Sequence, residues 1–238
     1  MDIFDRHDKI AFEFSGGKDS LAALHLLHGY RDRFTVYWLN AGDAFPETLE
    51  IVDHVRNAPG IRFVEVTSDV HKVIDEFGIP SDVVPCSNTN TGRLIDGEQN
   101  VLVQSRYDCC ARSVMIPLHQ RVIADGNTCI IRGQKSCDNG VPVKGGMVDG
   151  VEIFNPIVDW TTEDVFQYLR AYSLPISPVY ESMKTTPECM TCSAWWDDGR
   201  AAYMKDRYPE KYAMYQGRLE QIRIAVAPHI AAFNVEVQ

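Results

Sequence analysis

The sequence lacks long apolar segments and an excess of positive charge. No run approaches the roughly 18 to 20 apolar residues that cross a bilayer. The first residues, MDIFDRHDKIAFEF, lack the basic and apolar regions of a signal peptide, so we expect a cytoplasmic protein that does not bind a membrane. Because the formal net charge is −10, a surface that coats nucleic acid throughout is also not expected.

Cysteine is present seven times, but none follows Cys192. In a reducing compartment these thiols are core residues, metal ligands or reactive groups rather than a disulfide framework. Internal repeats and low-complexity segments are also missing. A chain of 238 residues can form one sizeable α/β domain, or one domain with an appendage.

Apolar periodicity predicts an alternation of strands and helices in the first third of the chain. Strands are expected at 9–14, 34–39 and 61–66, with helices at 19–28 and 46–55 between them. Such alternation predicts a parallel sheet with right-handed crossovers. Ligands of such sheets lie beyond the carboxyl ends of the strands.

The pattern weakens over residues 67–107, where prolines and polar residues predict a long irregular segment. Regularity returns with a helix at 110–124 and a strand at 128–133. A hairpin turn is expected near Asp149 and Gly150.

A further helix is predicted after Trp160. Thr161 and Asp164 have the spacing of a capping box, and an apolar face follows that includes Tyr172. The segment from residue 199 is helical in pattern. We therefore expect a main domain over 1–198 and a helical extension over 199–238 that packs on it.

The sequence SGGKDS, between the first strand and the first helix, has the composition of a phosphate-binding loop. Gly16 and Gly17 allow a tight turn and close approach to a ligand. The amides at the helix N-terminus and the Lys18 ammonium attract anions. The spacer of the Walker motif is missing, so this is a different kind of phosphate loop. The expected ligand contacts come from Ser15, Gly16, Gly17, Lys18, Asp19 and Ser20.

This loop resembles the PP-loop of the ATP pyrophosphatase superfamily. The segments LNAGDAFPETL, DCCARSVMIPL and FNPIVDWTTEDVFQYL, followed by C-x-x-C, resemble segments of the phosphoadenylylsulfate (PAPS) reductase family in the same order. The resemblance runs from residue 12 to 192. It implies a Rossmann-like α/β fold of the adenine nucleotide alpha hydrolase type, with a mostly parallel sheet flanked by helices. It also implies adenine-nucleotide binding, with further contacts from Asn40, Gly42, Arg132, Gln134 and Lys135.

Two cysteine pairs stand out, the adjacent Cys109 and Cys110 and the C-x-x-C pair Cys189 and Cys192. The spacing alone leaves zinc binding, redox chemistry and core packing open. The pattern is similar to that of assimilatory adenylylsulfate (APS) reductases. That resemblance implies a [4Fe-4S] cluster held by all four thiolates.

The other three cysteines have different settings. Cys129 lies in an apolar strand and is predicted to be a core residue. Cys137 follows the IRGQKS segment, where neighbouring cations favour a reactive thiol, although a plain loop cysteine is the alternative. Cys86 has the same two interpretations.

Two features depart from the reductase pattern. The sulfonucleotide reductases generally lack the loop lysine that is present here as Lys18, and their nucleophilic cysteine lies in a C-terminal segment that has no counterpart after Cys192. Lys18 favours an enzyme that cleaves ATP to AMP and pyrophosphate and adenylates an acceptor for iron-sulfur-assisted sulfur transfer. Lys18, Arg132 and Mg²⁺ would stabilise the leaving pyrophosphate, and Cys137 would carry sulfur.

Two alternatives accompany this interpretation. The first is an APS or PAPS reductase that releases sulfite and uses a thioredoxin-like reductant. The second is a nucleotide-binding iron-sulfur module without catalysis. The acceptor could be a small molecule, tRNA or DNA, and the family resemblance adds a homodimer to the expectations.

Overall fold

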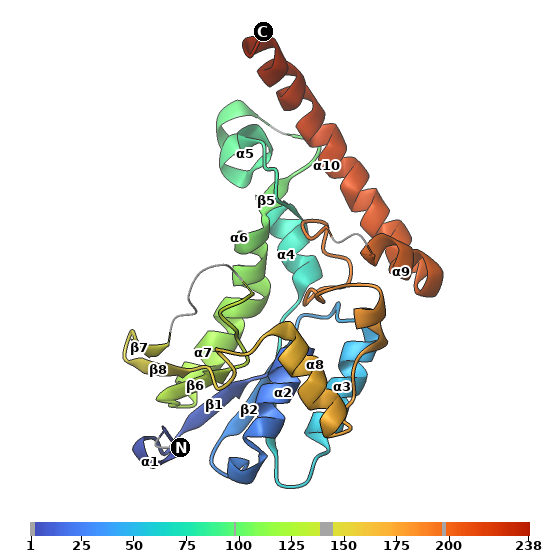
Figure 1. Cartoon of the computed structure of the whole chain (residues 1–238). Coiled ribbons are helices and arrows are strands. Elements are labelled where there is room, and N and C mark those ends of the chain that lie inside the picture. The colour runs from blue at the N-terminus through green and yellow to red at the C-terminus, as the bar shows by residue number, and fades with distance from the viewer. Residues whose placement is uncertain (1–2, 98, 139–144, 197–198) are drawn as a thin grey trace. The chain divides into compact units, whose positions relative to one another are not determined.

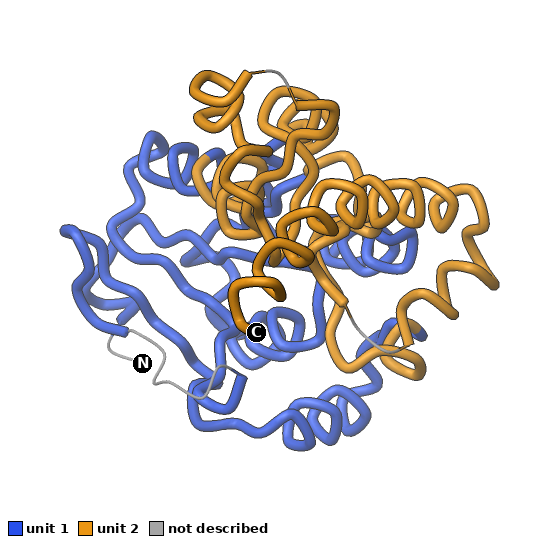
Figure 2. Tube along the Cα trace, turned by 90° about the horizontal axis from the view of Figure 1, so that it is seen from above, with its two compact units in different colours: residues 1–40, 45–67, 117–178 blue, residues 41–44, 68–116, 179–238 orange. Residues whose placement is uncertain are grey.

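The computed structural model describes residues 3–97, 99–138, 145–196 and 199–238. They form two compact units (Figure 2). Unit 1 comprises residues 1–40, 45–67 and 117–178, and unit 2 comprises 41–44, 68–116 and 179–238. The division at residue 198 that the sequence suggests stays a prediction.

Unit 1 contains a six-stranded sheet with the order β3-β2-β1-β6-β8-β7. All neighbouring strands are parallel except β7 and β8, which form an antiparallel hairpin. The hairpin turns at Asp149 and Gly150, both with positive φ, where the sequence places the turn. The strands are β1 Ile10–Glu13, β2 Thr35–Asn40, β3 Arg62–Thr67, β6 Cys129–Arg132, β7 Gly146–Val148 and β8 Val151–Phe154.

The helices of unit 1 follow the sequence signals closely. Helix α3 begins at Pro46, which suits a first helical position, and α8 begins after Thr161 with the capping box complete. Helices α2 and α8 lie side by side (Figure 1). The helices are α1 Ile3–Arg6, α2 Lys18–Leu26, α3 Pro46–Arg56, α7 Ile116–Ala124, which begins one residue before the unit, and α8 Thr162–Ala171.

The central strands form the core of unit 1. Phe12 of β1 and Ile130 and Ile131 of β6 are fully buried, as expected for parallel strands covered on both faces. Val165 and Leu169 of α8 are also buried, but Tyr172 is 57% exposed. The prediction that Tyr172 belongs to the apolar face was wrong, because α8 ends at Ala171 and Tyr172 is its cap residue.

The connectivity creates a switch point beside β1. From β1 the chain moves outward through β2 to β3 and later returns to place β6 on the other side of β1. The loops after β1 and β6 therefore leave the sheet next to each other in opposite directions, which is where open α/β sheets bind ligands. The predicted fold class is confirmed.

Unit 2 is mostly helical, with one two-stranded parallel sheet of β4 and β5. A continuous helical run leads from α6 through a π-helical turn at Ala111–Met115. The other elements are α4 Val70–Phe77, β4 Ile79–Ser81, α5 Asn90–Asp96, β5 Val103–Ser105, α6 Arg106–Cys110, α9 Arg200–Arg207 and α10 Pro209–Glu236; short 3-10 turns lie at His28–Tyr30, Cys86–Asn88 and Pro178–Glu181 across the chain. None of the described helices has the length and apolarity needed to cross a bilayer.

The prediction of an irregular segment over 67–107 was wrong. Helix α4 lies there, capped by the Asp69 carboxylate, which accepts hydrogen bonds from the amides of His71 and Lys72. A cap residue followed by Val70, Val73, Ile74 and Phe77 is a helix signal. The prolines of this segment lie beyond the end of α4. They interrupt the apolar pattern of the segment as a whole, and this hides the signal of the helix that precedes them.

We expect the Thr161→Ala substitution to lower the free energy of unfolding by about 1 kcal/mol, because the Thr161 hydroxyl accepts the amide of Asp164 and caps α8. Urea unfolding followed by tryptophan fluorescence measures the change. The matched control is Thr162→Ala, at the exposed first residue of the same helix. Equal effects of the two substitutions would contradict the role of the cap.

Candidate functional site

The loop after β1 folds on itself at the N-terminus of α2. Gly16 has φ of +79°, and a Cβ there would lie 2.6 Å from Cγ2 of Thr48. The hydroxyls of Ser15 and Ser20 are 3.1 Å apart, and the Ser20 hydroxyl donates to the Gly17 carbonyl. Gly17 precedes α2 without a side-chain cap. The helix N-terminus is therefore suited to an anion.

The loop after β6 passes directly against this phosphate loop. A Cβ on Gly133 would lie 2.8 Å from the backbone of Asp19 and Ser20, so only glycine allows this approach. One residue earlier, the Arg132 guanidinium lies 2.6 Å from the Glu13 carboxylate, and these residues are register partners at the ends of β6 and β1. The structure thus brings the two predicted nucleotide-binding segments together.

The Asp19 carboxylate joins the two loops electrostatically. One oxygen lies 2.8 Å from Nζ of Lys18 and the other 2.6 Å from Nζ of Lys135, which also pairs with Asp138 at 2.9 Å. Lys135 is fully buried. Burial by itself would lower the pKa of Lys135, but its hydrogen bonds to Asp19 and Asp138 outweigh burial and raise it. Lys135 therefore holds a fixed positive charge beside the phosphate loop, and Lys18 pairs with the same carboxylate.

Four further predicted residues lie in less enclosed positions. Gln134 and Cys137 are exposed, and the Cys137 thiol donates to the Trp160 carbonyl at 3.4 Å. Asn40, at the end of β2, donates its amide to Glu65 at 2.9 Å. Gly42 belongs to unit 2 and has φ of +84°.

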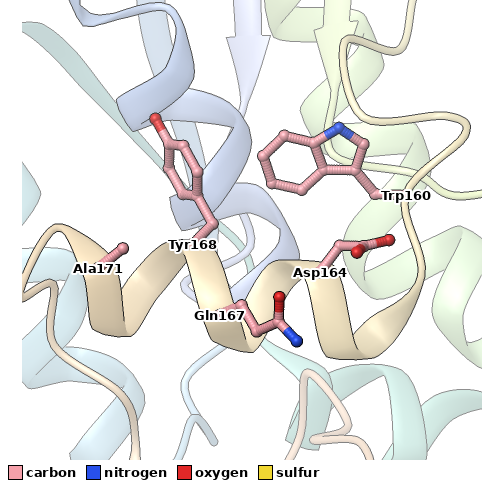
Figure 3. Close-up of a pocket in the computed structure, with 5 residues that line it drawn as sticks. All are labelled: Trp160, Asp164, Gln167, Tyr168 and Ala171. Atoms are coloured by element: carbon pink, nitrogen blue, oxygen red, sulfur yellow. The ribbon is translucent and has the colours of Figure 1, made fainter.

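A pocket of about 510 Å³ lies along α8, and no sequence pattern predicts it. It is lined by Trp160, Asp164, Gln167, Tyr168 and Ala171 (Figure 3). The Tyr168 hydroxyl lies 2.9 Å from Nδ1 of His25. Burial, followed by the nearby His28, lowers the pKa of His25. No predicted site residue lines this pocket.

The four cysteines of the two pairs belong to unit 2 and interact with one another. Burial, followed by the thiols of Cys110 and Cys192, raises the pKa of Cys109 to about 12. Burial and then Cys192 raise the pKa of Cys110 to about 11. Burial is also the main reason that the pKa of Cys189 lies well above its usual value, with Cys192 and Cys109 among its further causes. The fold therefore gathers all four thiols in one region.

These thiols do not form a preorganised metal site. Among the residues that the structure describes, no group of three or more His, Cys, Asp or Glu side chains is arranged to hold a metal ion. The donor set itself, four thiols with no competing histidine in the predicted set, suits an iron-sulfur cluster. The cluster assignment stays a prediction.

The remaining cysteines separate by burial. Cys129 is fully buried in β6, which confirms the prediction of a core residue, and burial, followed by Glu152, raises the pKa of its thiol to about 12. Cys86 and Cys137 are exposed.

Comparison with known families agrees with the geometry. The model of the phosphoadenosine phosphosulfate reductase domain matches residues 9–90 and 130–195. The chain belongs to this family. The matched ranges contain the phosphate loop, Cys137 and the C-x-x-C pair, whereas Cys109, Cys110 and helix α10 lie outside them.

Individual relatives carry reductase names. The chain is 25% identical over 214 residues to an adenosine 5'-phosphosulfate reductase of Burkholderia cepacia, covering 83% of this chain and 80% of the relative. It is 25% identical over 178 residues to a phosphoadenosine 5'-phosphosulfate reductase of Xylella fastidiosa, covering 73% and 68%. The crystal structure of PAPS reductase from Candida auris shares the fold, with a TM-score of 0.50 and 13% identity. The match covers 75% of this chain and 80% of that chain.

Cysteine reactivity should follow burial in the metal-free chain of this family member. At pH 8 we expect Cys86 and Cys137 to react with iodoacetamide at least on the order of tenfold faster than Cys109, Cys110 and Cys129, because only the thiolate reacts. The rates of the buried thiols should rise with pH up to about 11 to 12. Mass spectrometry of quenched samples measures each site. Labelling of Cys109 at the rate of Cys137 would contradict the burial.

Proposed function

We propose that this chain is a sulfonucleotide reductase that releases sulfite from APS or PAPS. The single observation that carries the proposal is the pairing of Asp19 with Lys135, which holds the loop of Cys137 against the phosphate loop. An adenine nucleotide bound at Ser15–Ser20 would then lie near a loop that carries a thiol. Membership of the PAPS reductase family and the reductase names of the relatives support this chemistry.

The chemistry proceeds in two steps. The Cys137 thiolate attacks the sulfonate sulfur, a sulfur-sulfur bond forms, and the bond from sulfur to the bridging phosphate oxygen breaks. The nucleotide leaves as AMP, or as its 3'-phosphorylated form. A dithiol such as a thioredoxin-like protein then supplies two electrons and releases sulfite, restoring the thiol.

The residues around the loop take separate roles in this proposal. The amides at the start of α2 and the Lys18 ammonium bind the phosphate, since helix N-termini and fixed cations stabilise anionic groups. Arg132 ends β6, Gln134 and Lys135 follow it in the neighbouring loop, and Asn40 ends β2. Cys137 is exposed, so its thiol can reach the sulfur of a bound substrate.

The four cysteines of unit 2 would hold a [4Fe-4S] cluster. Four thiolates are the usual ligand set of such a cluster, and the four thiols interact in the folded chain. A bound cluster supplies a redox-active group and a fixed charge.

A second function is favoured by Lys18. In this function the chain would cleave ATP and adenylate an acceptor for sulfur transfer. Lys18, together with Mg²⁺, would stabilise the pyrophosphate that leaves. A nucleotide-binding module without catalysis would bind the same ligands and form neither product.

One parallel assay separates these functions. Anaerobically purified protein receives APS, PAPS or ATP with Mg²⁺ and a thioredoxin system, and sulfite and pyrophosphate are measured. We expect sulfite from APS or PAPS, a loss of at least about 10³-fold in the Cys137→Ser variant, which removes the nucleophile, and full activity in the matched Cys86→Ser variant. Sulfite at the normal rate from Cys137→Ser would overturn the role of Cys137.

ATP addresses the second function in the same assay. Pyrophosphate that requires Lys18, as tested by Lys18→Ala, with no sulfite from either sulfonucleotide, would replace the reductase proposal. Nucleotide binding without either product would favour the non-catalytic module.

The cluster has its own test. We expect about four iron atoms per chain and a broad visible absorption band after anaerobic reconstitution, because four thiolates bind one [4Fe-4S] cluster. The Cys109→Ser variant should lose both signals, whereas Cys86→Ser should retain them. One zinc atom per chain with no iron would instead support the zinc interpretation.

A further inference from the structure

The turn between the C-x-x-C cysteines is held by a buried carboxylate. The Asp43 side chain is 1% exposed, and one of its oxygens accepts hydrogen bonds from the amide, at 2.9 Å, and the hydroxyl of Thr191. The Asp43 carbonyl accepts the amide of Met190 at 2.6 Å. Met190 and Thr191 are the two residues between Cys189 and Cys192, so Asp43 contacts both of the residues that separate these thiols.

Helix α10 supplies the cations of this network. Nζ of Lys211 lies 3.0 Å from the other oxygen of Asp43. The Arg218 guanidinium donates to the carbonyl of Thr191 at 2.9 Å and to its hydroxyl at 2.7 Å. Lys211 and Arg218 are seven residues apart, which is two helical turns, so they share one face of α10.

A buried carboxylate is stable only when a basic side chain pairs with it and its oxygens accept hydrogen bonds. Asp43 accepts two hydrogen bonds from Thr191 and forms an ion pair with Lys211, so both conditions are met. Thr191 is fully buried and is held from both sides, by Asp43 and by Arg218. The turn therefore has few other conformations open to it.

We propose that Asp43, Lys211 and Arg218 are positioning residues of the thiol site, which clamp the Cys189–Cys192 turn through Thr191. The network makes α10, which lies beyond the range matched by the family, a working part of the site. Only the purpose of the clamp, which is to hold two cluster ligands in place, rests on the proposed cluster. The contacts of the clamp belong to the metal-free fold.

The clamp predicts cysteine accessibility without any metal. In the metal-free full-length chain, Asp43→Asn and Arg218→Gln should each raise the alkylation rates of Cys189 and Cys192 by on the order of tenfold, because each change removes a charge-assisted bond to the turn. The rate of Cys137 should stay unchanged and serves as the internal standard. The matched control is Arg223→Gln on the same helix, an exposed arginine whose ion pair, with Glu220 at 2.6 Å, lies within α10.

A second variant separates positioning from charge. Arg218→Lys keeps the positive charge but loses the rigid guanidinium plane, in which Nη1 donates to both oxygens of Thr191 while Nη2 lies 3.2 Å from Nδ1 of His71. Its alkylation rates should therefore lie close to those of Arg218→Gln. In the reconstituted protein, Arg218→Gln should lower the midpoint potential of the cluster, since loss of a nearby cation disfavours the more negative reduced state, and Arg218→Lys should lower it less.

The outcomes distinguish the clamp from the cluster. Unchanged alkylation of Cys189 and Cys192 in both Asp43→Asn and Arg218→Gln would overturn the clamp, whatever the iron content. Absence of iron from the unsubstituted protein would overturn the proposed cluster. The alkylation rates would still decide whether the clamp exists. Circular dichroism identifies a variant that fails to fold, and in that case the comparison of Arg218→Lys with Arg223→Gln decides.

Discussion

The pairing of the Asp19 carboxylate with two lysines is the interaction on which the nucleotide site depends. Lys18 comes from the phosphate loop and Lys135 from the loop after β6, so one carboxylate joins two segments separated by more than a hundred residues. Gly133 allows the close approach that this pairing requires. The bridge keeps two cations at the switch point of the sheet while satisfying a fully buried lysine, and it places an exposed thiol on the same loop.

The thiol site in unit 2 also depends on a carboxylate that is paired with basic side chains. Burial raises the pKa values of Cys109, Cys110 and Cys189, so metal binding must displace protons as well as gather the four sulfurs. The surrounding polar groups are fixed by a second carboxylate, Asp43, together with Lys211 of α10. In both units an acidic side chain between basic partners, partly buried Asp19 in one and buried Asp43 in the other, orders a loop that has little regular structure of its own. Buried charges with several partners specify one loop conformation.

Family membership and the individual residues of this chain answer different questions. The matched domain explains the parallel sheet and the nucleotide loop, and it supports sulfonucleotide chemistry. Lys18 and the position of Cys137 are properties of this chain, and the two proposed functions, with a sulfonucleotide or with ATP, rest on them. The Asp43 network lies partly in α10, beyond the matched ranges, so a comparison limited to the family domain would miss it.

Local sequence determined the elements whose signals are contiguous: the strands of unit 1, the capped start of α8, the hairpin turn at Asp149 and the glycines of the phosphate loop. It missed α4, although its cap and apolar spacing were present, because prolines beyond its end dominated the wider window. Only the tertiary structure decided that Lys135 is buried against Asp19, and that Asp43 and Arg218 meet at Thr191. These pairs are remote in the chain, and neither periodicity nor spacing encodes which distant carboxylate will neutralise a buried cation.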